Sequence, residues 1–151
     1  MIVLVDTSVW LLALRRTAGQ LNERQHQLVG EWRTLIEQRR VAMIGPVRQE
    51  ILSGIRSVRA FENLRARLMP FPDLPLDTAL YEEAAACFNR CRADGVTGTA
   101  IDMVLCAAAA RFGLSIFTTD RDFERYANVL SLRLHARQLS FLLYSAPLPA
   151  Q

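Results

Sequence analysis

Four acidic residues that are far apart in the sequence occupy positions where they could support catalysis together: Asp6, Glu50, Asp102 and Asp120. Asp6 directly follows an apolar run at 2–5, and Asp120 follows a second apolar run at 114–118. Active sites of open α/β sheets lie at the carboxyl ends of the strands. We therefore expect these carboxylates to meet at one edge of a sheet.

Two of the four carboxylates have apolar neighbours. Glu50 lies three residues after Val47 and next to Ile51, beside the buried stripe of its expected helix. Asp102 follows Ala-Ile and precedes Met-Val-Leu in the first turn of another expected helix. A carboxylate in apolar surroundings is unfavourable unless it is paired or bound to a metal.

Converging carboxylates repel one another, so some must be protonated or a cation must lie between them. Oxygen ligands without histidine or thiolate suit Mg²⁺ or Mn²⁺. Such a site serves phosphoryl transfer, in which one metal lowers the pKa of a water and a second, about 3.5–4 Å away, stabilises the leaving oxygen.

Each acidic residue also has a purely structural explanation. Asp6 could cap the helix that follows it. Asp102 with Thr99 resembles a capping box. The others could be turn, cap or solvated residues: Asp120, Asp122 and Glu50. Their occurrence together at one expected edge favours a shared site.

Composition excludes several rival chemistries. The chain has 151 residues and 18 basic side chains, all of them arginine. Without lysine there is no Schiff-base lysine and no P-loop lysine, and receiver or haloacid-dehalogenase-like folds are disfavoured. The net charge is +3, but without the four candidate carboxylates 11 acidic residues remain against 18 arginines. A basic surface around an acidic pocket suits binding of RNA.

Cysteines and histidines show no pattern of a metal or disulfide site. Cys87 and Cys91 lie one helical turn apart, and neither His26 nor His135 is near them in the sequence, so buried packing is the better interpretation. Three cysteines, no signal peptide and no apolar run long enough for a bilayer predict a cytoplasmic protein without a membrane partner.

The apolar periodicity alternates between strand and helix, which predicts an α/β fold with a five-stranded parallel sheet flanked by helices. The expected strands are 2–5, 41–44, 69–71, 114–118 and 129–134. The expected longer helices are 23–37, 47–53, 58–68, 77–92 and 99–111, with helical turns at 10–14 and 122–126. We expect one domain over 1–143 and a tail at 144–151. A group of arginines in and just before the expected helix at 58–68 is either a solvated face or a track for RNA: Arg56, Arg59, Arg65 and Arg67.

Four segments together resemble a PIN domain, and within that family the VapC-type toxins of bacterial toxin–antitoxin pairs. They are the opening Met-Ile-Val-Leu-Val-Asp-Thr-Ser-Val-Trp, Glu50-Ile-Leu-Ser-Gly54, Asp102 at the start of an alanine-rich helix, and Thr118-Thr-Asp-Arg-Asp-Phe123. The resemblance implies a five-stranded parallel sheet and a Mg²⁺- or Mn²⁺-dependent endoribonuclease that cleaves RNA.

The resemblance also implies roles for individual residues. Asp6, Asp102 and Asp120 would bind the metal, and Glu50 would be a further ligand or would orient the attacking water. Small polar side chains would support them: Thr7, Ser8 and Thr118. The role of Asp122 stays open, and Thr119 departs from the family, which often has a basic residue there.

A cognate antitoxin and a homodimer are implied by the resemblance as well. Two alternatives keep the domain but change its function, namely a housekeeping RNA-processing nuclease and a catalytically idle RNA-binding domain. The complete acidic set favours an active enzyme over the idle domain.

Overall fold

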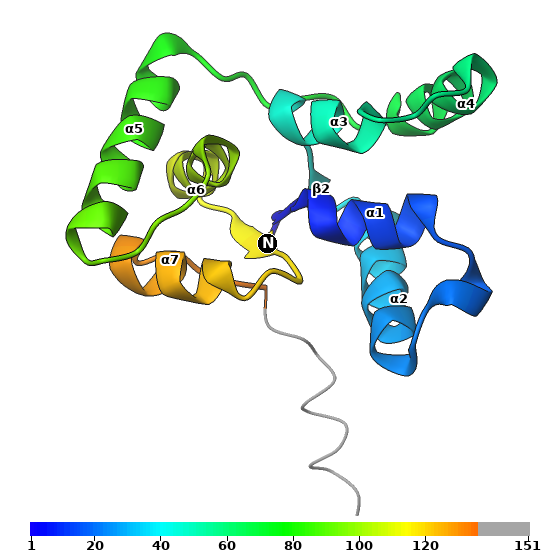
Figure 1. Cartoon of the computed structure of the whole chain (residues 1–151), viewed down its shortest axis with the longest axis horizontal. Coiled ribbons are helices and arrows are strands. Elements are labelled where there is room, and N and C mark those ends of the chain that lie inside the picture. The colour runs from blue at the N-terminus through cyan, green and yellow to red at the C-terminus, as the bar shows by residue number, and fades with distance from the viewer. Residues whose placement is uncertain (136–151) are drawn as a thin grey trace, which may run out of the picture.

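Three short parallel strands form the centre of the molecule, and helices surround them (Figure 1). The computed structural model describes residues 1–135. β1 (Val3–Val5) pairs with β2 (Val41–Ala42) on one side and with β3 (Ser115–Phe117) on the other. All three residues of β1 are fully buried, as expected for the central strand of a parallel sheet that is covered on both faces.

The prediction of five strands is wrong, because the described residues contain only three. At the two outer positions the chain makes single parallel bridges, Met43 with Asp73 and Ile116 with Leu134. Prolines at 70, 72 and 75 surround the first bridge, and proline cannot donate to a strand ladder.

The expected strand at 129–134 was wrong for a different reason. The helix α7 (Asp122–Leu130) continues through the first part of this segment. Phe123, Tyr126 and Leu130 lie on the buried face of α7 at helical spacing. The helix therefore includes Val129 and Leu130, the first two residues of the expected strand.

The remaining helices agree with the sequence-based expectation to within a few residues at their ends. They are α1 (Thr7–Arg15), α2 (Glu23–Glu37), α3 (Gly45–Leu52), α4 (Val58–Leu68), α5 (Thr78–Ala93) and α6 (Ala100–Phe112). A short 3₁₀ helix at Ala18–Gln20 was not expected from the sequence. Capping side chains explain four of the starts: Asn22, Ser57, Asp77 and Thr99. Gly113 ends α6 with φ 65°, a backbone conformation that favours glycine.

The core on the α1 side is organised by Trp10. Its ring meets Trp32 of α2 and Phe71 edge-on, with centroid distances of 5.4 and 5.1 Å. Its indole N–H donates to the carbonyl of Val5 at 3.2 Å. These contacts fix α1 against the end of β1, where the first candidate residue lies.

α6 is buried on most of its surface, with every residue from Met103 to Ala109 inside the core. It packs against α5, and Figure 1 shows both beside α7. Over residues 1–135, none of the helices has the length and the apolar character needed to cross a membrane. The expected boundary between the domain and a tail at 143/144 lies outside the described residues.

Candidate active site

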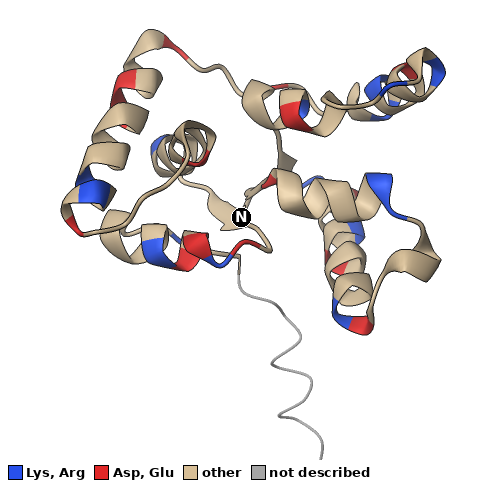
Figure 2. Ribbon diagram, in the orientation of Figure 1, with Lys and Arg blue, Asp and Glu red and all other residues tan. Residues whose placement is uncertain are grey.

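The acidic residues come from four separate segments around the carboxyl ends of the strands. Asp6 lies between β1 and α1, Glu50 in α3, Asp102 in the first turn of α6, and Asp120 in the loop between β3 and α7. Figure 2 shows acidic segments at the start of α1, in α3, in α6 and before α7. The topology thus directs the four residues toward one edge of the sheet, as the sequence predicts.

Asp6 is buried, with 8% of its surface exposed. Its Oδ2 accepts hydrogen bonds from Ser8 Oγ at 2.7 Å and from Thr118 Oγ1 at 2.8 Å. Burial raises the pKa of Asp6, and the two hydroxyl donors oppose that rise. Although Asp6 is the N-cap residue of α1, its side chain makes no capping bond, so capping does not explain the choice of aspartate.

Asp102 is both a helix-capping residue and a carboxylate of the candidate site. It forms the capping box with Thr99, whose Oγ1 accepts from the Asp102 amide at 3.1 Å. Asp102 Oδ2 also accepts a hydrogen bond from the hydroxyl of Tyr126 at 3.0 Å. Burial raises the pKa of Asp102, the Tyr126 and Thr99 bonds oppose this, and the negative charge of Asp6 raises it further. Asp6 and Asp102 therefore lie within each other's electrostatic field.

Glu50 is half-buried and faces the start of α1. Thr7 Oγ1 donates to Glu50 Oε2 at 2.5 Å, which joins α1 to α3 across 43 residues of sequence. This contact rules out a freely solvated helix charge and places Glu50 next to the residue that follows Asp6.

Asp120 is exposed and closes a turn. Its amide donates to Thr118 Oγ1 at 3.0 Å, and its Oδ1 accepts from the Asp122 amide at 2.9 Å. Asp122 forms an ion pair with Arg125 at 2.5 Å on the surface of α7. Thr118 thus connects Asp120 to Asp6, whereas Asp122 takes part in a local helix contact.

Two residues near the site were missed by reasoning from the sequence. Tyr126 is buried in α7 and positions Asp102. Gly98 allows this approach, because a Cβ at Gly98 would lie 2.6 Å from Met103 Cε and 3.0 Å from the Tyr126 ring and hydroxyl. A tyrosine on the buried face of an amphipathic helix was the available signal, since its hydroxyl needs a partner.

The donor set consists only of oxygen atoms, which suits Mg²⁺ or Mn²⁺. Within residues 1–135, no three carboxylate, imidazole or thiol groups converge closely enough to form a complete metal cage. Mg²⁺ commonly uses one or two carboxylates and keeps several waters. The pair Asp6 and Asp102 fits that smaller requirement. Glu50 is hydrogen-bonded to Thr7, the residue after Asp6, and Asp120 is connected to Asp6 through the Thr118 hydroxyl.

The fold and the site define an α/β domain with an acidic centre at the carboxyl edge of a parallel sheet. The family model of the PIN domain matches residues 3–129, and the chain belongs to the PIN-domain family. VapC ribonuclease Mb1587 of Mycobacterium bovis and ribonuclease VapC11 of Mycobacterium tuberculosis are each 31% identical to it over 133 residues, which cover 87% of this chain and 96% of theirs.

Solved structures with the same fold include FitAcB from Neisseria gonorrhoeae, with a TM-score of 0.70 at 20% identity, covering 90% of this chain and 98% of that one. VapBC2 from Rickettsia felis, bound to a DNA fragment from its promoter, gives a TM-score of 0.69 at 14% identity and covers 89% of this chain and 98% of that one. At these identities the structures support the fold.

Proposed function

We propose that this protein is a metal-dependent endoribonuclease and the toxin of a toxin–antitoxin pair. The observation that carries the proposal is the pair of carboxylates formed by buried Asp6 and half-buried Asp102 at the carboxyl edge of a PIN-domain sheet. The ribonuclease names of relatives at 31% identity support the same activity.

Asp6 and Asp102 would hold Mg²⁺ or Mn²⁺, and Asp120 would act through one of the waters that such an ion keeps. When bound, the metal lowers the pKa of a water and stabilises charge on the phosphate oxygens. The protein's part is to keep these carboxylates ionised and oriented. Ser8 and Thr118 do this for Asp6, and Tyr126 does it for Asp102, each through a hydroxyl that donates to Oδ2.

In this proposal Glu50 would orient the attacking water and accept a proton from it. The water oxygen would bond to phosphorus as the bond from phosphorus to the leaving sugar oxygen breaks. The proton of the water would pass to the Glu50 carboxylate, and the leaving oxygen would take a proton from solvent. The hydrogen bond from Thr7 fixes Glu50 Oε2 beside the start of α1, one residue after Asp6. A positioned carboxylate of this kind contributes about 10²–10⁴-fold to rate.

The test is cleavage of a mixed-sequence RNA by the purified full chain, with Mg²⁺ or Mn²⁺ and with EDTA. We expect EDTA to abolish cleavage, and Asp6→Ala and Asp102→Ala to lower it about a hundredfold or more while circular dichroism stays unchanged. Asp94→Ala, which alters an exposed aspartate at the end of α5, is the control and should cleave like the wild type. Full cleavage by both site variants, or in EDTA, would contradict the proposal.

The toxin role and the partners need tests of their own. We propose that a small antitoxin encoded by the adjacent gene binds and inhibits the protein, and that the protein itself is a homodimer. Expression of the protein alone should arrest growth, and co-expression of the adjacent small protein should restore it. Cleavage in vitro without growth arrest would favour the housekeeping nuclease, and RNA binding without cleavage would favour the idle domain. Sedimentation equilibrium tests the homodimer.

A further inference from the structure

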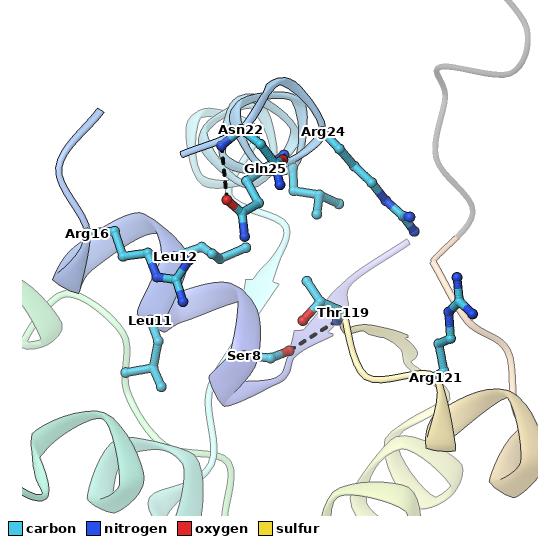
Figure 3. A pocket seen from close by; sticks show the side chains of 10 residues that line it. Ser8, Leu11, Leu12, Arg16, Asn22, Arg24, Gln25, Thr119 and Arg121 are labelled. Carbon is cyan, nitrogen blue, oxygen red and sulfur yellow. Dashed lines mark hydrogen bonds between the residues drawn. The ribbon is translucent and has the colours of Figure 1, made fainter. Parts of the chain in front are cut away.

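A hollow of about 420 Å³ opens beside the acidic centre, between α1, α2 and the loop before α7 (Figure 3). Three arginines from these separate segments line it. They are Arg16 at the end of α1, Arg24 in the first turn of α2, and Arg121 at the start of α7. Figure 3 shows Arg24 and Arg121 extending toward one another from opposite walls. We call this hollow the arginine groove.

The arginines of the groove have no acidic partner among the described residues. The arginines that form ion pairs within residues 1–135 lie outside the groove: Arg48, Arg65, Arg111 and Arg125. Among residues 1–135, no aspartate or glutamate lines the groove. Figure 3 shows Arg16 on the opposite side of the groove from Arg24 and Arg121. Three positive charges around one hollow form a site of positive potential that attracts anions.

The groove is continuous with the acidic centre. Ser8 lines the groove and donates to Asp6 Oδ2 at 2.7 Å, and the Thr119 amide on the same wall donates to Ser8 Oγ at 3.1 Å. A second hollow of about 380 Å³ shares Arg24, Thr119 and Arg121 with the groove and reaches Asp120. The two hollows therefore bring Arg24, Arg121 and Asp120 along one stretch of the surface, which Glu124 also lines.

We propose that Arg24 and Arg121, assisted by Arg16, bind the phosphates of the RNA strand that flank the phosphodiester to be cleaved. The guanidinium fork binds phosphate oxygens in bidentate fashion, and arginine holds its charge at every relevant pH. Phosphate contacts position a strand without reading its sequence. The position of the cleaved bond in this inference rests on the proposed function, whereas the phosphate binding itself does not.

The test is binding of a fluorescein-labelled mixed-sequence single-stranded RNA to the full chain in EDTA, measured by fluorescence anisotropy at several salt concentrations. We expect Arg24→Gln and Arg121→Gln each to weaken binding about five- to tenfold. Each should also lower the slope of log affinity against log salt by about 0.7, the value for one phosphate contact on a single strand. A substitution that only reduced the folded fraction would lower the affinity but would leave the slope of log affinity against log salt unchanged.

Two variants serve as matched controls. Arg33→Gln removes an exposed arginine from the same helix as Arg24, outside the groove. Arg92→Gln removes an exposed arginine from the last turn of α5, and Arg92 lines neither of the two hollows. Both should keep the wild-type affinity and salt slope, and all variants should keep the wild-type circular dichroism.

The outcomes separate the groove from the proposed function. Loss of affinity in the groove variants alone supports the inference, even if the wild type cleaves no RNA in any metal. Unchanged affinity and slope in Arg24→Gln combined with Arg121→Gln overturns it, even if the wild type cleaves RNA. A groove double variant that keeps RNA binding but escapes inhibition by the adjacent small protein also overturns it, in favour of a protein ligand.

Discussion

Asp6 shows how the requirements of the site act against those of folding. Its carboxylate is buried, and burial raises its pKa. Its negative charge also raises the pKa of Asp102. A pKa raised by folding means that the folded state holds the proton more tightly, so ionised Asp6 lowers the free energy of unfolding at neutral pH. This destabilisation is relieved as the pH falls through the raised pKa.

We therefore expect Asp6→Asn to stabilise the metal-free protein at pH 7, by about 0.5–2 kcal/mol, while abolishing RNA cleavage. The advantage over the wild type should shrink as the pH is lowered, because wild-type Asp6 then becomes neutral as well. Urea denaturation in EDTA at several pH values measures both effects. A variant less stable than the wild type at pH 7 would show that the hydroxyl bonds to Asp6 outweigh its burial.

Tyr126 is a positioning residue for Asp102, through its hydroxyl bond of 3.0 Å to Oδ2. Tyr126→Phe removes this donor and keeps the ring that packs on Phe123. We expect metal affinity or the cleavage rate to fall about tenfold, as for other partners of metal ligands. Isothermal titration with Mn²⁺ separates lost binding from lost rate.

Tyr81→Phe is the control for this change. It also removes one tyrosine hydroxyl, but Tyr81 lies on the exposed side of α5. Its metal affinity and rate should equal those of the wild type, and an equal loss in both variants would contradict a specific role for Tyr126.

At the scale of elements, the approach of α6 and α7 depends on Gly98 in the loop before α6. An alanine Cβ there would lie 2.6 Å from Met103 Cε and 3.0 Å from Tyr126, which is too close without movement of both neighbours. We expect Gly98→Ala to destabilise the protein by about 1–3 kcal/mol and to lower activity, because Tyr126 is displaced from Asp102.

Gly30→Ala is the matched control for Gly98→Ala, because it makes the same substitution on another element. Gly30 lies within α2 and has nothing within 4 Å of an added Cβ. Alanine there should stabilise the helix by about 0.5–1 kcal/mol without changing activity. Thermal unfolding of the two variants should thus move the midpoint in opposite directions, and a shared direction would contradict the steric explanation.

At the scale of the whole molecule, metal binding and folding are linked through the acidic centre. A ligand that binds only the folded state stabilises it, by about 2.7 kcal/mol at a hundred times its Kd. We expect Mg²⁺ or Mn²⁺ to raise the midpoint of thermal unfolding of the wild type, and EDTA to reverse the rise. Asp6→Asn should not respond, and a metal response of equal size in that variant would place the ion elsewhere.

Much of the architecture could be predicted from the sequence because local patterns carry it. Caps such as Asn22 and Thr99 and the stop at Gly113 define helix ends through contacts within a few residues. The outer strands were less predictable, because Asp73 and Leu134 each make only one bridge to the sheet. A branched or apolar residue can fit either a strand or a helix until its tertiary neighbours are known.

The sequence by itself determined which residue types stand at the ends of β1 and β3 and at the start of α6, because chain order and the parallel topology direct those positions to one edge. Only the tertiary structure decided the partners of each carboxylate. Thr118 reaches Asp6 across 112 residues, Tyr126 reaches Asp102 across 24, and Arg24 and Arg121 line one groove. The physical reason is that hydrogen bonds and burial depend on distances of a few ångströms, which separation along the chain does not specify.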